Sequence, residues 1–216
     1  MRDDNQPLFI VFAGPNGSGK STLKRDSEHD SDFPERYINA DEIKKETGCT
    51  DLEAQAKAAQ ECEDALNNEE SFAFETVFSH PSKLELMQCA KESGYWVRLY
   101  FMCLQDAELN VDRVDKRVSS GGHSVPADKI KSRYDRSMQL LQQSFNLADE
   151  AMVFNNSLEN PELIARKTSD GKVHIYPLHE KDSRSKWTKE AINSLLGINE
   201  PTLLNNNHLP RKGHGR

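Results

Sequence analysis

Residues 8–22 read Leu8-Phe9-Ile10-Val11-Phe12-Ala13-Gly14-Pro15-Asn16-Gly17-Ser18-Gly19-Lys20-Ser21-Thr22. The first six residues form an apolar run bounded by turn residues, which predicts a short buried strand. The run leads directly into the pattern Gly-x-x-x-x-Gly-Lys-Ser. A glycine-rich loop of this kind bends tightly enough to direct several backbone N–H groups inward, where they bind phosphates. The stretch therefore predicts a phosphate-binding loop between a strand and a helix.

The parts of this loop have separate roles in binding a nucleoside triphosphate. The helix that follows directs the positive end of its dipole at the phosphates, and Lys20 adds a cation for the β- and γ-phosphates. The hydroxyl of Ser21 is expected to bind Mg²⁺. The residues predicted to bind ATP in this loop are Gly14, Pro15, Asn16, Gly17, Ser18, Gly19, Lys20, Ser21 and Thr22.

The composition of the 216-residue chain limits its function class. The formal net charge of -7 argues against a protein that coats nucleic acid. Apolar runs stay well below the roughly 18–20 residues of a membrane span, and the N-terminal residues lack the pattern of a secretory signal. The cysteines Cys49, Cys62, Cys89 and Cys103 are irregularly spaced, which is typical of reduced thiols rather than zinc ligands. We therefore expect a cytoplasmic protein without nucleic-acid or membrane partners.

Strand and helix patterns alternate after the loop. Strands are expected at residues 36–41, 71–78, 95–104, 151–155 and 172–178, and helices at 51–68, 81–93, 106–118 and 126–146. This alternation predicts an α/β fold with a mostly parallel central sheet flanked by helices, as in the three-layer kinase-like P-loop NTPases.

The predicted organisation is one kinase domain with a short extension. The domain is expected over residues 1–180, with a helical lid at about 106–140. Residues 181–216 are expected to form a polar, partly disordered extension, in which 187–196 could be a short helix.

Two carboxylates are expected at the carboxyl ends of strands, where ligands bind in such sheets. Asp41 follows Asn39 at the end of the second strand, and is either a general base for an acceptor hydroxyl, an acid beside Mg²⁺, or the N-cap of the next helix. Glu75 ends an apolar strand in the manner of a Walker B acid, which suggests a role beside Mg²⁺ or in holding the substrate; the alternative is an ordinary strand-end carboxylate.

Four arginines lie on the two helices of the predicted lid. Arg113 and Arg117 share one helical face, as do Arg133 and Arg136, and a Gly-Gly-His turn containing His123 separates the pairs. A glycine hinge would let both helices close onto the phosphates. The alternative interpretation is a solvated basic face, and His123 is either a lid contact or a turn residue.

Four quoted segments together resemble one family. They are the loop Gly14–Thr22, then Asn39-Ala-Asp41-Glu, then Phe74-Glu75-Thr76, and then Arg117-Val-x-x-Gly-Gly-His123-x-Val-Pro-x-x-x-Ile-x-x-Arg133-Tyr-x-Arg136-Ser. This arrangement, over about residues 8–156, resembles zeta toxins and their stand-alone bacterial relatives. Zeta toxins are P-loop kinases that phosphorylate the 3′-hydroxyl of the amino sugar in UDP-N-acetylglucosamine.

The resemblance implies roles for particular residues. Lys20 and Ser21 would bind ATP and Mg²⁺, and Asp41 stands at the position of the base. Glu75 and Thr76 match the segment that holds the amino sugar, and Asn39, Asp41 and His123 are further candidates for binding the substrate. Arg117 and either Arg133 or Arg136 match the arginines that clamp the phosphates, and Arg113 is a further candidate for binding ATP.

The resemblance also suggests an antitoxin protein as a partner. Two alternatives remain open at this point: a kinase for another small-molecule hydroxyl, and a nucleotide-dependent switch that acts through a protein partner.

Overall fold

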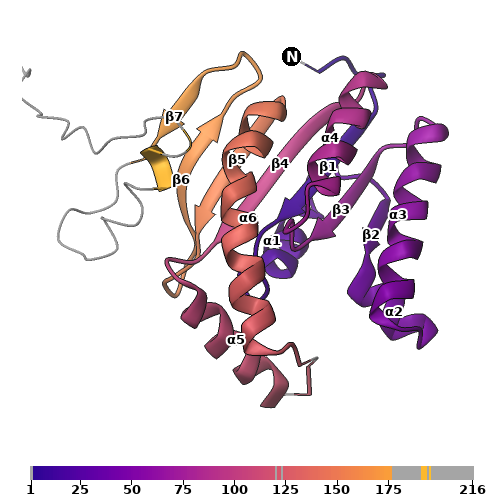
Figure 1. The fold of residues 1–216 in the computed structure, drawn as a ribbon. Coiled ribbons are helices and arrows are strands. Elements are labelled where there is room, and N and C mark those ends of the chain that lie inside the picture. The colour runs from indigo at the N-terminus through magenta and orange to yellow at the C-terminus, as the bar shows by residue number, and fades with distance from the viewer. Residues whose placement is uncertain (1, 120, 123, 177–190, 194, 196–216) are drawn as a thin grey trace, which may run out of the picture.

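A mixed β-sheet forms the centre of the molecule (Figure 1). The computed structural model describes residues 2–119, 121–122, 124–176, 191–193 and 195. Within these residues the sheet has seven strands in the order β2-β3-β1-β4-β5-β6-β7. The strands are β1 (Leu8–Ala13), β2 (Arg36–Asn39), β3 (Phe72–Thr76), β4 (Trp96–Cys103), β5 (Glu150–Asn155), β6 (Glu162–Lys167) and β7 (Val173–Ile175).

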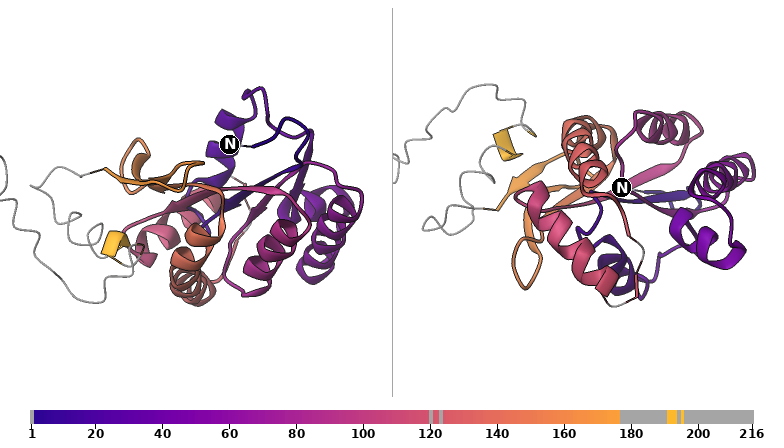
Figure 2. Two further views of the ribbon diagram at one scale, coloured as in Figure 1. Left: turned by 90° about the horizontal axis from the view of Figure 1, so that it is seen from above. Right: turned by 60° about the horizontal axis from the view of Figure 1, so that its bottom comes forward.

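Helices cover both faces of this sheet (Figure 2). They are α1 (Lys20–Ser27), α2 (Ala40–Thr47), α3 (Asp51–Asn67), α4 (Ser82–Glu92), α5 (Ala107–Ser119) and α6 (Ala127–Leu147). One apolar core packs Phe9 and Val11 of β1 against α3, α4 and α6. The smaller core lies on the opposite face. There Leu8, Ile10 and Phe12 of β1 pack in a cluster with Leu23 of α1, with Phe33 and with Tyr37 of β2. Every residue of β1 is buried, as the continuous apolar run predicts for a central strand.

The sheet is parallel from β2 through β5 and antiparallel beyond it. The predicted mostly parallel α/β fold is therefore confirmed, and the carboxyl ends of β1 to β5 meet at one edge. Strand β6 was not predicted, because its two polar ends leave only Leu163, Ile164 and Ala165 as an apolar signal. No helix among the described residues is both long and apolar enough to span a bilayer.

The C-terminal predictions fall mainly outside the described residues. Of residues 181–216 the structure describes only 191–193 and 195, where Ala191 and Leu195 are buried. Leu195 belongs to the larger core, so the chain returns to the domain at this point. The boundary at residue 180 stays a prediction.

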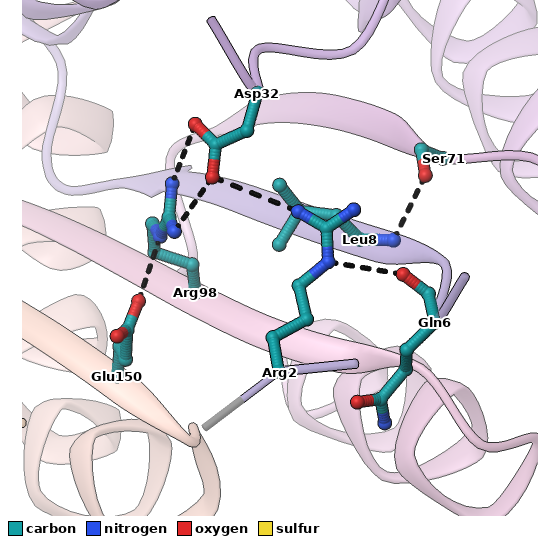
Figure 3. A network of polar contacts seen from close by, with 7 residues as sticks. All are labelled: Arg2, Gln6, Leu8, Asp32, Ser71, Arg98 and Glu150. Atoms are coloured by element: carbon teal, nitrogen blue, oxygen red, sulfur yellow. Dashed lines mark hydrogen bonds and ion pairs between the residues drawn. The ribbon is translucent and has the colours of Figure 1, made fainter. Parts of the chain in front are cut away.

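An ionic network fixes the segment between α1 and β2 to the sheet (Figure 3). Arg98 of β4 donates through both terminal nitrogens to the carboxylate of Asp32, at 3.2 and 2.9 Å, and through Nε to Glu150 of β5 at 2.9 Å. Arg2 pairs with the same Asp32 carboxylate at 3.6 Å. The connection that follows the helix of the phosphate-binding loop is thereby anchored to two central strands.

Candidate active site

A cleft of about 440 Å³ opens at the edge where the parallel strands end. It is lined by the phosphate-binding loop, by the ends of β2 and β3, and by side chains of the helices α2, α3, α5 and α6. Lys20, Ser21, Asp41, Glu75 and Thr76 all line this one cleft. The structure thus brings together residues that are far apart in the sequence, as the topology of a parallel sheet predicts.

The glycines of the loop are required by close backbone approaches. Gly14 has φ +141°, and a Cβ atom there would overlap the carbonyl oxygen of Met102 on β4. Gly19 has φ +101°, and a Cβ atom there would overlap the side-chain amide of Asn156. Only glycine adopts these conformations without strain and leaves room for the neighbouring atoms. The loop therefore has the tight geometry that a phosphate cradle needs.

Two asparagines that the sequence analysis missed hold the loop from outside. Asn110 of α5 donates its amide hydrogen to the carbonyl oxygen of Asn16 at 2.5 Å, and Asn156 donates to the carbonyl oxygen of Ser18 at 2.8 Å. Both bonds engage carbonyl oxygens, which are the backbone groups that repel a phosphate. Asn156 directly follows β5, so its place at the end of a parallel strand was a usable signal in the sequence. The complete burial of Asn110 within α5 gave no such signal.

Lys20 is a buried cation that faces this loop. Its side chain donates to the carbonyl oxygen of Pro15 at 3.1 Å, and the residue is only 8% exposed. Burial lowers the pKa of Lys20, and the nearby carboxylates of Glu75 and Asp41 oppose that shift. Burial removes the water that would otherwise solvate an ammonium group. A buried ammonium therefore binds an anion strongly, because the anion replaces the lost interactions with water.

Glu75 links the phosphate-binding loop to the neighbouring strand. One carboxylate oxygen accepts a hydrogen bond from the Ser21 hydroxyl at 2.8 Å, and the other accepts one from the Tyr37 hydroxyl at 2.7 Å. A hydroxyl beside a carboxylate supplies the hard oxygen ligands that suit Mg²⁺. No cluster of three or more His, Cys, Asp or Glu side chains occurs among the residues that the structure describes. Such a cluster is not needed where nucleotide phosphates and water complete the coordination.

Asp41 lies in a helix, whereas the sequence predicts it at the end of a strand. The expected strand 36–41 ends at Asn39, and Asp41 belongs to the first turn of α2. The proposal that Asp41 is the N-cap of this helix is wrong, because Asn39 is the cap and accepts the backbone N–H of Asp41 at 2.9 Å. The carboxylate of Asp41 is therefore not occupied in capping. It is exposed and lines the cleft.

The four arginines of the predicted lid occupy two different places. Arg113, Arg117 and Arg133 line the cleft, and Arg133 contacts the Asn16 side-chain oxygen at 3.4 Å. Arg136 does not line it, and its Nε instead donates to the carbonyl oxygen of Ser79 at 3.1 Å. The prediction for His123 lies outside the described residues.

The segment after β3 forms the other end of the cleft. Phe78 is fully buried and has φ +57°, a conformation that is rare for a bulky residue. The conformation is held from α6, where the Ser137 hydroxyl donates to the Val77 carbonyl at 3.0 Å and Arg136 holds Ser79. Strained backbone of this kind clusters at functional sites. Thr76 therefore directly precedes a segment whose backbone conformation is fixed by hydrogen bonds from α6.

Comparison with known proteins identifies the family. The zeta toxin family model matches residues 1–178. An uncharacterized protein of Haemophilus influenzae is 33% identical over 134 residues, which are 60% of this chain and 94% of that protein.

Two solved structures share the fold. The AvrRxo1-ORF1:-ORF2 structure with ATP has a TM-score of 0.58 at 15% identity, over 88% of this chain and 76% of that chain. A structure of the PezAT toxin–antitoxin system of Streptococcus pneumoniae has a TM-score of 0.54 at 14% identity, over 91% and 89% of the two chains. With the family model covering most of its length, the chain belongs to the zeta toxin family of ATP-using P-loop kinases.

Proposed function

We propose that this protein transfers the γ-phosphate of ATP to a UDP-activated amino sugar, at the 3′-hydroxyl of UDP-N-acetylglucosamine. The observation that carries the proposal is the shared cleft, which is lined both by the phosphate-binding loop with Lys20 and by the exposed residue Asp41. Phosphoryl transfer requires a phosphate cradle and an acceptor base that open onto one space. Membership of the zeta toxin family supports the choice of acceptor.

The nucleotide half of the proposed site consists of the loop and the arginines of the lid. Lys20 balances charge on the β- and γ-phosphates, and Arg117 and Arg133 approach the transferred group from α5 and α6. Arg113 lies nearer the segment after β5, because it donates to the Asn156 carbonyl at 2.6 Å. Mg²⁺ would be held beside Ser21 and Glu75, where it would supply additional positive charge to the phosphates.

The acceptor half of the proposed site is organised around Asp41. As the acceptor oxygen bonds to the γ-phosphorus, the bond to the β-phosphate oxygen breaks and ADP leaves. The proton of the acceptor hydroxyl passes to the Asp41 carboxylate. Thr76, Asn39, Glu75 and His123 are proposed to hold the sugar.

The proposal includes a protein partner. One solved structure of the fold is a complex of AvrRxo1-ORF1 with ORF2, and another comes from the PezAT toxin–antitoxin system. We propose that an antitoxin-like protein neutralises this kinase in the cytoplasm.

A phosphate-transfer assay tests the proposed reaction. Labelled ATP and Mg²⁺ are offered with UDP-N-acetylglucosamine, and in parallel with UDP-glucose, free N-acetylglucosamine and uridine. Asp41→Asn is expected to abolish transfer while ATP still binds, and Glu46→Gln, an exposed acid on the same helix, is the matched control. Transfer to a different acceptor would keep the kinase and overturn the UDP-sugar assignment. ATP binding without transfer to any acceptor would favour the partner-regulated switch.

A further inference from the structure

The hydroxyl of Tyr37 on β2 lies between the two halves of the site. It donates to one carboxylate oxygen of Glu75 at 2.7 Å and accepts from the side-chain amide of Asn39 at 2.9 Å. Tyr37 is not among the residues that line the cleft. Its contribution is therefore made through other side chains and not by touching a ligand.

These two bonds are the middle of a longer chain of hydrogen bonds. The second carboxylate oxygen of Glu75 accepts from Ser21 at 2.8 Å, and the side-chain oxygen of Asn39 accepts from the backbone N–H of Asp41 at 2.9 Å. Asn39 and Glu75 are direct partners in the register of β2 and β3. The chain thus runs from the backbone N–H of Asp41 to the hydroxyl of Ser21 in the phosphate-binding loop.

The direction of this chain is fixed at Tyr37. The side-chain nitrogen of Asn39 can only donate, so the Tyr37 hydroxyl accepts from it and donates its own hydrogen to Glu75. The Lys24 ammonium lies 4.4 Å from the centre of the Tyr37 ring, which adds a cation–π contact that holds the ring in place.

We propose that Tyr37 is a positioning residue that aligns the metal-binding side of the site with the acceptor side. By holding Glu75 it orients the carboxylate beside Ser21, and by engaging Asn39 it stabilises the cap that sets the start of α2 and hence the place of Asp41. This inference rests on the proposed roles of Ser21 and Glu75 toward Mg²⁺. It adds a residue that the family resemblance does not assign in this chain.

The variant Tyr37→Phe removes the hydroxyl and keeps the ring that packs under Lys24. Because the loss of one hydrogen bond to a charged group typically costs a factor of about ten or more, the affinity for ATP in the presence of Mg²⁺ is expected to fall at least about tenfold. The affinity for ATP in EDTA is expected to stay unchanged, because the loop and Lys20 are intact. The Mg²⁺ concentration for half-maximal transfer is expected to rise by a similar factor. Tyr176→Phe, at the far edge of the sheet, is the matched control.

Two further variants separate the possible failures. Asn39→Asp keeps an oxygen to cap α2 but removes the donor to Tyr37, so it is expected to shift the Mg²⁺ dependence in the same direction. Glu75→Gln tests the proposed function itself. The positioning role is overturned if Tyr37→Phe binds ATP like the wild type with and without Mg²⁺ while Glu75→Gln loses the Mg²⁺ effect. If Glu75→Gln also shows no change, the proposed role of Glu75 toward the metal fails and the inference falls with it.

Discussion

Two arginines three residues apart on α6 provide a sharp test of the site. Arg133 lines the cleft, whereas Arg136 holds the carbonyl of Ser79 behind the acceptor end. From the sequence alone both were candidates for binding the transferred phosphate. The structure gives them different tasks, and glutamine substitutions at each position should therefore change different kinetic constants.

The expected sizes of the two effects follow from the contacts. Among the residues that the structure describes, Arg133 makes one hydrogen bond, a long one of 3.4 Å to the Asn16 side-chain oxygen, so we expect most of its donors to be available for phosphate oxygens. Removing an arginine that stabilises charge on a transferring phosphoryl group costs about 10²–10³-fold or more in kcat. Arg136 makes one exposed bond of 3.1 Å. Its loss is worth about 1 kcal/mol, or about fivefold in the KM for the acceptor, with kcat unchanged.

Steady-state kinetics with ATP and acceptor varied separately measure both variants. Arg133→Gln is expected to lower kcat strongly, and Arg136→Gln to raise only the acceptor KM. Lys129→Gln, an exposed cation on the same helix, controls for the loss of one positive charge. A large fall in kcat for Arg136→Gln with little effect of Arg133→Gln would refute this reasoning and would show that the helix turns in the working enzyme.

Two further predictions concern the loop and the ionic network. Gly19→Ala is expected to weaken ATP binding at least tenfold in a calorimetric titration. The new methyl group would overlap the side-chain amide of Asn156, and the positive φ at this position costs a non-glycine residue about 1–2 kcal/mol. Wild-type affinity would contradict the loop geometry. Arg98→Met is expected to lower the free energy of unfolding by about 2 kcal/mol at neutral pH, after allowance for the partial exposure of Asp32. Because Arg98 lowers the pKa of Asp32 below its ordinary 3.8, this difference should be present above pH 4 and shrink as the pH falls through the lowered pKa, as acid denaturation series of both proteins would show. A difference that does not depend on pH would contradict the ion-pair explanation.

The elements predicted well from the sequence are those whose signals are local. The strands β1 and β4 are mainly apolar runs, and the Gly-x-x-x-x-Gly-Lys-Ser pattern is by itself enough to predict a phosphate-binding loop. Once these were placed, the topology of a parallel sheet was enough to bring Asp41 and Glu75 to one cleft. Strand β6 was not predicted because its sequence has mixed polarity. Its strand conformation depends on antiparallel pairing with β5, and the periodicity of its own residues does not indicate that pairing.

The predictions for single residues were limited by partners that are remote in the sequence. Tyr37 reads as an ordinary strand residue, and only the pairing of β2 with β3 shows that its hydroxyl reaches Glu75. Asn39 reads as a substrate ligand, yet both ends of its amide already have partners in the protein and the residue is only 9% exposed. A sugar hydroxyl that bound Asn39 would have to displace the bond to Tyr37 or the helix cap, and either loss would disturb Asp41. Thr76 has no comparable conflict within the described part of the chain, where its hydroxyl accepts one long hydrogen bond, of 3.3 Å, from the backbone N–H of Phe78. Of the proposed sugar contacts that the structure describes, Thr76 is therefore the one whose side chain is most available to bind a ligand.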